Sequence, residues 1–324
     1  MDTSLIILTL ASMLADSSPL VFAVIGETIS EKAGVTNLSL DGSILLSAMV
    51  GFAVAFTTDN LYLAFLAAML VGAIVASIVA FSSIVLKLDQ IAVGFVLTLL
   101  CTDLSTFFGN PFVRKPGPAV PHLAIPGLEN IPVLGKLFFD QNVVVYLSFV
   151  AIIAAWFYIY KTQPGLKLQG IGERPAAAFA RGTNVNVQRF IYTIIGGAFV
   201  GFGGASYSLF VKLGWAYHLT SGLGWIALSI VIFGGWHPIR AAFGAYIFGG
   251  LQSLSGMSQS IPAFANVPTQ VFQTAPFALM IVALLIVSNE SIDHFFSGSP
   301  MSRKIWQSLR GTPPGALGSV FEQE

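Results

Sequence analysis

The chain has 324 residues, of which 55% are hydrophobic and 9% are charged, and its mean hydropathy is +0.80. Soluble domains carry roughly 25% charged residues, so this composition excludes an ordinary soluble protein. The formal net charge is zero and the charges are segregated by loop, which argues against a nucleic-acid partner. We therefore expect an all-α, polytopic transmembrane helix bundle.

The apolar segments predict about nine spans, because a helix needs roughly 20 residues to cross the hydrocarbon. The first, at residues 5–24, follows no basic stretch, so we expect it to remain as a span and not to be cleaved as a signal peptide. A further, partly buried helix near residues 15–33 would raise the count to ten and move the N-terminus to the other side. The remaining full-length spans are expected at residues 61–86, 91–108, 143–160, 190–211, 239–254 and 272–287.

Two apolar segments, at residues 44–56 and 225–233, are too short to span and resemble broken helices. Polar, Gly-containing runs precede them, GVTNLSLDGS in the first case and TSGLG in the second. Non-helical backbone at membrane depth is tolerated only beside protein or a water-filled cavity. We therefore expect the substrate pathway between these two segments.

The polar side chains at these two segments are the candidate pathway residues. They provide hydrogen-bonding groups with little charge, which suits a neutral, hydroxyl-rich or heterocyclic solute, and Trp225 adds a surface for stacking. Ordinary helix capping explains the polar residues of the first segment equally well. The candidates are Asn37, Ser39 and Asp41 at the first segment, and Ser221 and Trp225 at the second.

Loop charges predict the orientation. Lys87, the loop at 161–190, Arg240 and the basic residues of the tail fall on one side, which the positive-inside rule assigns to the cytoplasm. The N-terminus and a structured, Pro- and Gly-rich loop at 109–142 would then lie outside. The chain is thus expected to comprise a transmembrane permease domain, residues 1–290, and a polar, flexible cytoplasmic tail, residues 291–324.

The loop at 161–190 contains five cations and a single acid, Glu173. Within it, ERPAAAFARG at residues 173–182 predicts a short helix, with Pro175 near its start and Gly182 at its end. Such a helix would project from the bilayer for a soluble partner to grip. An ordinary connecting loop is the alternative.

Enzyme and metal chemistry find little support. The four histidines are scattered, the single cysteine, Cys101, lies in an apolar run, and no G-x-x-x-x-G-K-[ST] motif occurs. We expect no metal and no resident cofactor, and any energy from ATP must come from another subunit. Asp103 is the one carboxylate well inside an apolar run, and it suits a pathway role or an interfacial cap equally well. The 32 glycines are best explained by close helix contacts.

Four stretches carry a resemblance to a known family: GETISEKAGVTNLSLDG, KPGPAVPHLAIPGLENIPVLGKLFF, QPGLKLQGIGERPAAAFARGTNV and SGLGWIALSIVIFGGWHPIRAAFGAYIFGG. In this order and spacing they resemble the permease subunit of ABC importers for nucleosides and simple sugars, a group related to ribose and branched-chain amino-acid permeases. The resemblance runs from about residue 15 to about residue 290. It implies two permeases, two cytoplasmic ATPase subunits that bind the ATP, and a solute-binding protein on the outside.

The resemblance also implies roles for individual positions. Two departures, Thr98 in place of an Asn and Pro276-Phe277 in place of a Pro-Tyr pair, remove hydrogen-bonding capacity and bear on the identity of the solute. Residues matching the ATPase-coupling pattern are Glu173, Pro175, Ala177, Ala178 and Gly182, and Arg174 lies among them. Residues matching the broken helices are Gly34, Asn37, Ser39 and Gly42 in the first, and Gly222, Gly224, Ala227 and Leu228 in the second.

The solute remains open between a nucleoside, a pentose and other simple sugars. By analogy with the nucleoside branch, we expect the second permease to be a paralogue, and both to sit among lipids in a prokaryotic cell membrane. An ion-coupled secondary transporter would need more intramembrane charge, and a channel would not need the basic loop.

Overall fold

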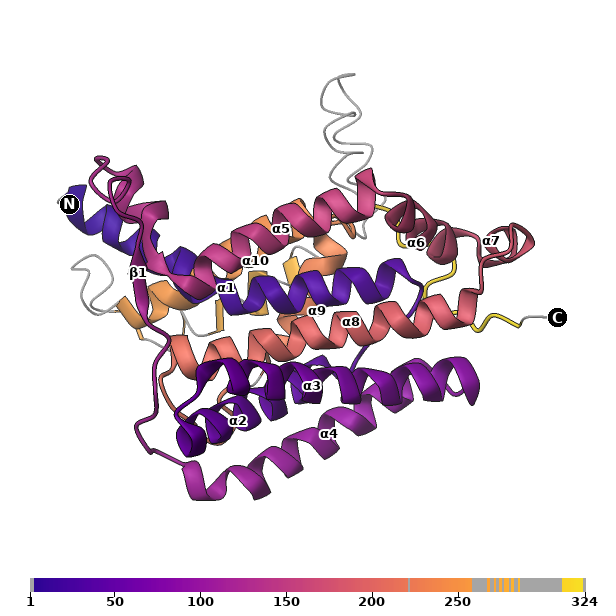
Figure 1. Ribbon diagram of the computed structural model, residues 1–324, viewed down its shortest axis with the longest axis horizontal. Helices are drawn as coiled ribbons and strands as arrows, with labels where there is room; N and C mark the ends of the chain where they lie inside the picture. The colour runs from indigo at the N-terminus through magenta and orange to yellow at the C-terminus, as the bar shows by residue number, and fades with distance from the viewer. Residues whose placement is uncertain are drawn as a thin grey trace.

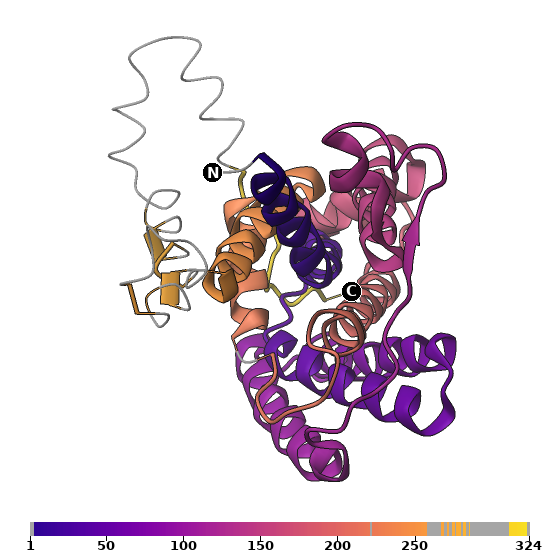
Figure 2. The same cartoon turned by 90° about the vertical axis from the view of Figure 1, so that its left-hand side faces the viewer.

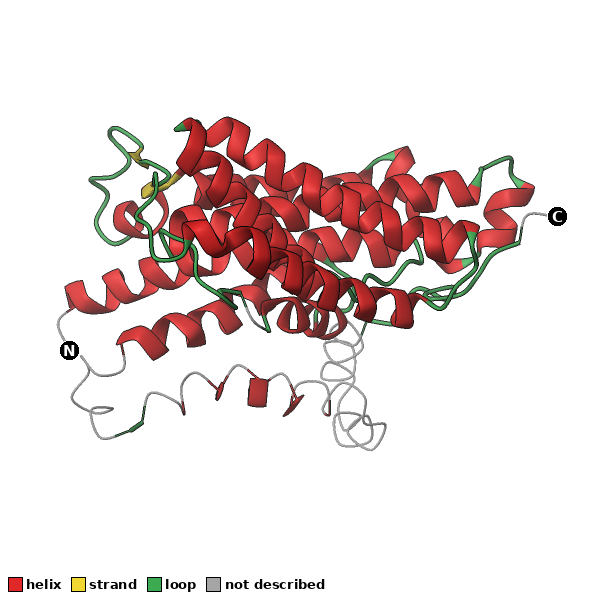
Figure 3. Cartoon of the chain, turned by 90° about the horizontal axis from the view of Figure 1, so that it is seen from below, coloured by secondary structure: helices red, strands yellow, loops and turns green. Residues whose placement is uncertain are grey.

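The computed structural model describes residues 3–220, 222–257 and 311–322, together with scattered positions between 267 and 285. Half of the span expected at 272–287 therefore lies outside the described residues. Within them, six helices are long and apolar enough to cross a membrane. These helices run side by side, with the connecting loops gathered at the two ends (Figure 3). The expected all-α transmembrane bundle is confirmed.

Helix α1 (Thr3–Lys32) forms the centre of the bundle. Figure 2 shows it between α10 (Pro238–Met257) and α5 (Val143–Lys161), and every residue from 17 to 34 is buried. The helix continues without interruption through Pro19 and through the polar GETISEK stretch. A separate helix near residues 15–33, which would have made a tenth span, is therefore wrong.

Helix α8 (Val185–Ser206) packs against α1 and α3 (Leu61–Ala80) through glycines. A Cβ on Gly72 of α3 would lie 2.2 Å from the carbonyl oxygen of Gly197, and one on Gly196 would lie 2.5 Å from that of Gly26. Only glycine permits such a close approach of two helix backbones. The interpretation of glycines as helix-contact residues is thus confirmed for the glycines between α1, α3 and α8. Short π-helical turns, η1 (Phe81–Val85) and η4 (Tyr207–Val211), extend α3 and α8.

Helix α2 (Leu40–Thr58) has 19 residues and is long enough to cross a membrane. The prediction of a short helix at 44–56 is wrong, because the polar run Leu40–Ser43 is helical: Ser43 N donates to Ser39 O at 2.8 Å. The irregular part is limited to residues 33–39. Helix α9 (Leu223–Phe233), with 11 residues, is short as predicted. Of the two helices expected to be too short to span, α9 is short and α2 is full-length.

Helix α4 (Gln90–Gly109) leads into the loop at 109–142, which is structured as expected. This loop lies at the same end of the bundle as the N-terminus (Figure 1). Its strands pair antiparallel, with Leu123 opposite Gln141. Its elements are η2 (Asn110–Phe112), β1 (His122–Ala124), η3 (Gly135–Phe139) and β2 (Asp140–Asn142).

At the opposite end, the loop at 161–190 contains two helices, α6 (Gln163–Glu173) and α7 (Pro175–Ala180). Thr162 caps α6 by accepting from Gly165 N at 3.2 Å, and Gly182 ends the α7 turn at a φ of +81°. The predicted short helix is therefore present, and the segment is not an irregular loop. Glu173 is the last residue of α6 and does not begin the short helix, which corrects one detail of the prediction.

The tail is not wholly flexible. Residues 311–322 follow an irregular path along the end of the bundle that carries α6 and α7, and Pro314 and Ala316 are buried there. Ala316 N donates to Gly172 O at 2.8 Å. The prediction of a flexible tail is wrong for this stretch, because backbone hydrogen bonds hold it in place although it lacks a long apolar run.

Candidate transport pathway and coupling surface

The first turns of α2 and α9 meet inside the bundle. Gly224 N donates a 3.0 Å hydrogen bond to Asp41 Oδ1, so the side chain of one predicted pathway segment caps the other. A Cβ on Gly224 would lie 2.1 Å from Asp41 N, and Gly222 turns the chain at a φ of +85°. Two glycines thus permit the contact. The structure brings the two predicted segments together, as the sequence indicated.

Asn37 and Ser39 are both buried, with 1% and 0% of their surfaces exposed. The amide oxygen of Asn37 accepts from both the backbone N and the hydroxyl of Ser39, and the Ser39 hydroxyl lies 3.1 Å from that of Ser43. These bonds fasten the irregular segment to the first turn of α2. Ser39 makes no side-chain capping bond, so simple N-capping does not explain it.

Thr98 lies beside this segment on α4. Its hydroxyl donates to Leu38 O at 2.9 Å, and a Cβ on Gly42 would lie 2.5 Å from Thr98 O. Helix α4 is thus packed directly onto the irregular segment. Thr98 therefore joins Asn37, Ser39 and Asp41 in one polar cluster, which we call the pathway cluster.

Three predicted positions are not placed in this cluster. Asp103 is exposed on α4, on the same face as Leu99 and Phe107, away from the irregular segment. Trp225 is partly buried against the central core, so its packing accounts for its side chain without a solute. Ser221 lies outside the described residues.

Two glutamates that we did not predict link the pathway cluster to the rest of the fold. Glu27 and Glu31 lie one turn apart on α1 and are buried. Glu27 Oε1 accepts from Asn37 N at 2.9 Å, and Glu31 Oε2 accepts from the indole N–H of Trp236, which follows α9. Each carboxyl group therefore holds one of the two pathway segments.

The sequence contained a signal for this pair. Hydropathy ended the first span at Val24 and left GETISEK outside it, although two acids at i and i+4 lie on one face of a helix. Reading the first apolar run and GETISEK as one helix places both carboxyl groups inside the bundle, where buried acids indicate function. Asp103, which we singled out as the one carboxylate well inside an apolar run, is therefore not the only carboxyl group in a membrane-spanning helix.

Three basic residues, Lys32, His237 and Arg240, lie close together at the end of α1 and the start of α10. The imidazole of His237 stacks on Tyr160, with ring centroids 5.0 Å apart. Burial, with the positive charges of Arg240 and Lys32, lowers the pKa of His237 below its ordinary value of 6.5. A neutral imidazole is thus favoured at this position.

A concave surface, which encloses a pocket of about 580 Å³, lies between α6 and α7. Five of the six predicted coupling residues line it, and the sixth, Pro175, begins α7. Both helices project from the end of the bundle opposite the N-terminus (Figure 1). The surface is therefore accessible to a soluble partner. The predicted residues in its lining are Glu173, Arg174, Ala177, Ala178 and Gly182, and Lys167 and Arg181 add further basic side chains.

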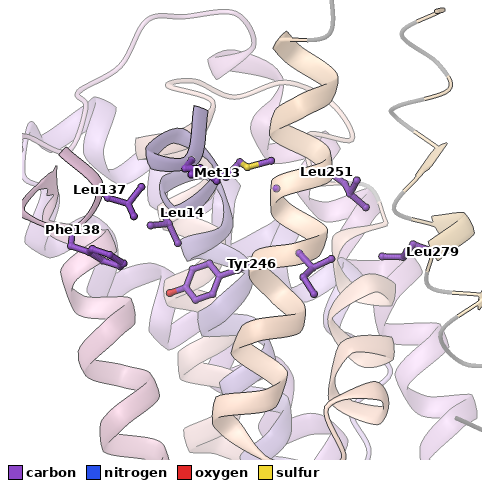
Figure 4. A pocket seen from close by; sticks show the side chains of 10 residues that line it. Met13, Leu14, Leu137, Phe138, Tyr246, Leu251 and Leu279 are labelled. Carbon is purple, nitrogen blue, oxygen red and sulfur yellow. The ribbon is translucent and has the colours of Figure 1, made fainter. Parts of the chain in front are cut away.

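A second cavity, of about 470 Å³, lies near the other end of the bundle. Figure 4 shows Met13 and Leu14 of α1 facing Tyr246 and Leu251 of α10, with Phe138 beside them. The lining is almost wholly apolar. Among its lining residues only Tyr246 carries a polar side-chain group, which is too few for a hydroxyl-rich solute.

Comparison with known proteins agrees with this architecture. A family model described as the permease component of a branched-chain amino acid transport system matches residues 9–284. A putative glucose ABC transporter permease of Haloferax volcanii is 39% identical over 246 residues, which cover 75% of each chain. A nucleoside ABC transporter permease of Lactococcus lactis is 32% identical, covering 87% of this chain and 92% of the relative. A guanosine ABC transporter permease of Bacillus subtilis is 34% identical, covering 83% and 88%. No solved structure matches the chain.

The chain belongs to this family of permease components and is the permease subunit of an ABC importer. It is a multi-pass membrane protein whose role is transport. Membership of this family implies an ATPase and a solute-binding protein as partners. This assignment replaces the alternatives of an ion-coupled secondary transporter and of a channel.

Proposed function

We propose that this chain and a second, paralogous permease form the pathway for a nucleoside or a simple sugar across a prokaryotic cell membrane. The relatives named for guanosine, nucleosides and glucose support this class of solute. The observation that carries the proposal is the meeting of α2 and α9 at Asp41 and Gly224.

The pathway cluster favours a neutral solute. Helix N-termini carry partial positive charge, and the N-terminus of α9 directs an amide at the carboxylate of Asp41. Asp41 is thereby neutralised in part and presents less negative charge to a solute. Asn37, Ser39 and Thr98 add uncharged amide and hydroxyl groups beside this contact, where they are buried and hydrogen-bonded within the protein. Opening of the pathway would free these groups to bond the hydroxyls of such a solute.

The exposed face of α4 is consistent with contact to a second permease subunit. It presents Asp103 among Phe95, Leu99 and Phe107, whose surfaces are 52% or more exposed. A carboxylate facing lipid costs about 2.5 to 3.5 kcal/mol at the bilayer centre and less toward the interface, and Asp103 lies within two turns of the end of α4. We therefore place this face against a second subunit or along the water-filled route between two permeases.

The concave surface between α6 and α7 is the proposed docking site for the ATPase. In this mechanism, ATP-driven closure of the ATPase dimer displaces α6 and α7 as a rigid unit, and the two permeases rock between outward- and inward-facing states. The residues of this coupling role are Glu173, Arg174, Pro175, Ala177, Ala178 and Gly182. ATP itself would be bound by the partner, so this chain needs no cofactor of its own.

The test is affinity purification of the tagged chain from its native membrane in mild detergent, followed by mass spectrometry. We expect recovery of a P-loop ATPase and a paralogous permease from the native chain. Ala177→Trp should fill the concave surface and abolish recovery of the ATPase. The control is Leu128→Trp, which places the same bulk on an exposed residue at the opposite end.

Uptake assays then test the solute. Cells with the native importer should accumulate radiolabelled guanosine or glucose, and Ala177→Trp should not. Recovery of the ATPase with Ala177→Trp at native levels would contradict the docking site. Uptake of neither probe nor of other nucleosides and sugars would contradict the proposed class of solute.

A further inference from the structure

Residues 311–322, which we call the C-terminal strap, run along the end of the bundle that carries the coupling helices. The strap touches elements distant in the sequence and lies between two regions that the proposed function requires to move together. One region is the coupling surface of α6 and α7. The other is the pair of chain segments that lead into α2 and follow α9.

The strap is hydrogen-bonded to α6 and contacts α7, the two helices that we call the coupling helices. Ala316 N donates to Gly172 O at 2.8 Å, and Gly315 N donates to Glu173 Oε2 at 3.1 Å, so two consecutive amides hold the end of α6. The ring of Phe321 packs edge-on against Phe179 of α7, with centroids 6.0 Å apart. A displacement of α6 and α7 would therefore pull directly on the strap.

The strap also contacts the segment before α2 and the segment after α9. Gly318 N donates to Gly34 O at 3.1 Å, just before the irregular segment that carries Asn37. At its other end, a Cβ on Gly311 would lie 2.2 Å from Gly235 Cα, next to Trp236. Asn37 and Trp236 are the two donors to the glutamate pair of α1. The strap thus reaches both segments where they meet the cytoplasmic end of α1.

Arg189 of α8 locks the strap in place. Only 2% of its surface is exposed, and its guanidinium donates from Nη1 to Ser319 O at 2.8 Å and from Nη2 to Ala316 O at 3.4 Å. Within the described residues, Arg189 forms no salt bridge. A buried charge is costly unless hydrogen bonds compensate it, so Arg189 depends on the carbonyl groups of the strap.

From these contacts we propose that the C-terminal strap transmits the motion of the coupling helices to the backbone on either side of the pathway cluster. This inference rests on the proposed docking of the ATPase at α6 and α7. The strap would act as a positioning element, because none of its residues belongs to the pathway cluster. Its function would be to couple ATP hydrolysis to transport.

The test uses the complete importer, reconstituted with its ATPase and solute-binding protein in liposomes. One variant ends the chain before Gly311, a second is Arg189→Met, and a third, Phe321→Ala, removes only the ring contact with Phe179. Val320→Ala is the control, because Val320 is a neighbouring residue of the strap that is 46% exposed. Recovery of the ATPase, ATP hydrolysis and uptake of radiolabelled guanosine and glucose are measured on the same preparations.

We expect all three variants to retain the ATPase subunit and hydrolyse ATP, while the solute transported per ATP falls by roughly two- to thirtyfold, least for Phe321→Ala. Val320→Ala should match the native importer. The truncation and Arg189→Met should also be non-additive, because both break the same contacts.

Two results would overturn the proposal. One is an unchanged ratio of uptake to hydrolysis in Arg189→Met and Phe321→Ala. The other is loss of the ATPase subunit from these variants, which would assign the strap to docking. If the native chain itself recovers no ATPase, the proposed docking fails, and this outcome is distinguishable because it does not depend on any change in the strap.

Discussion

The carboxylate of Asp41 accepts a 3.0 Å hydrogen bond from the backbone amide of Gly224, which lies 183 residues further along the chain. This single contact joins the first turn of α2 to the first turn of α9. Because both partners are held inside the bundle, a change at either residue acts on both pathway segments.

Replacing Asp41 by Ala is expected to lower uptake sharply while leaving recovery of the ATPase intact. The change leaves the amide of Gly224 without its acceptor, at a cost of about 1 to 3 kcal/mol. Asp41→Asn retains an oxygen acceptor and should fall between the native chain and Asp41→Ala. Uptake in liposomes and thermal unfolding in detergent measure the two effects. Equal uptake by the native chain and Asp41→Ala would contradict the assignment of this contact to the pathway.

Glu27→Leu is expected to destabilise the fold by about 1 to 3 kcal/mol, because it removes the acceptor of a buried backbone amide, that of Asn37. Glu27→Gln retains an oxygen acceptor and should recover much of this loss. The control is Thr28→Val, since the Thr28 hydroxyl donates only to Val24 O within the same helix. Thermal unfolding of the purified variants provides the comparison. A Glu27→Leu variant as stable as Thr28→Val would show that the carboxyl group does not hold the irregular segment.

Gly72→Ala is expected to weaken the packing of α3 on α8. Its Cβ would lie 2.2 Å from the carbonyl oxygen of Gly197, so the helices must move apart, at a cost of about 1 to 3 kcal/mol. Gly170→Ala in α6 is the matched control, because its Cβ would meet no atom within 4 Å. Unfolding temperatures in detergent should fall for Gly72→Ala and stay level or rise for the control.

The stability of the protein is expected to depend on the protonation of His237. Burial and the charges of Arg240 and Lys32 lower its folded-state pKa below 6.5, so the unfolded chain binds the proton more readily. Stability is therefore lost as the pH falls below about 6.5. His237→Gln should show a smaller difference between the unfolding temperatures at about pH 7.5 and pH 5.5 than the native chain. An unchanged difference would assign the acid sensitivity to other groups.

Much of the fold could be predicted because long apolar runs leave few alternatives to membrane-spanning helices. Spans such as 61–86 and 143–160 matched α3 with its π-turn, and α5. The short helix at α7 could also be predicted, because Pro175 and Gly182 mark its start and end locally. These features depend on neighbouring residues alone.

The candidate site was harder to predict, because its residues take their roles from distant partners. Asn37 and Asp41 were found through their polar character, but Glu27 was not singled out, since hydropathy ends the first span at Val24 although α1 continues to Lys32. Its place in the site depends on a hydrogen bond from Asn37 that forms only when the chain turns back after α1.

The sequence by itself determined the membrane-spanning class, the helix-containing loop at 161–190 and the two polar segments that precede α2 and α9. Hydrophobic burial and helix end signals set these features locally. Only the tertiary structure decided that Asp41 caps α9, that the glutamates of α1 hold both segments, and that the strap returns to Arg189. The physical reason is that buried polar groups require partners, and long-range folding selects which partners they meet.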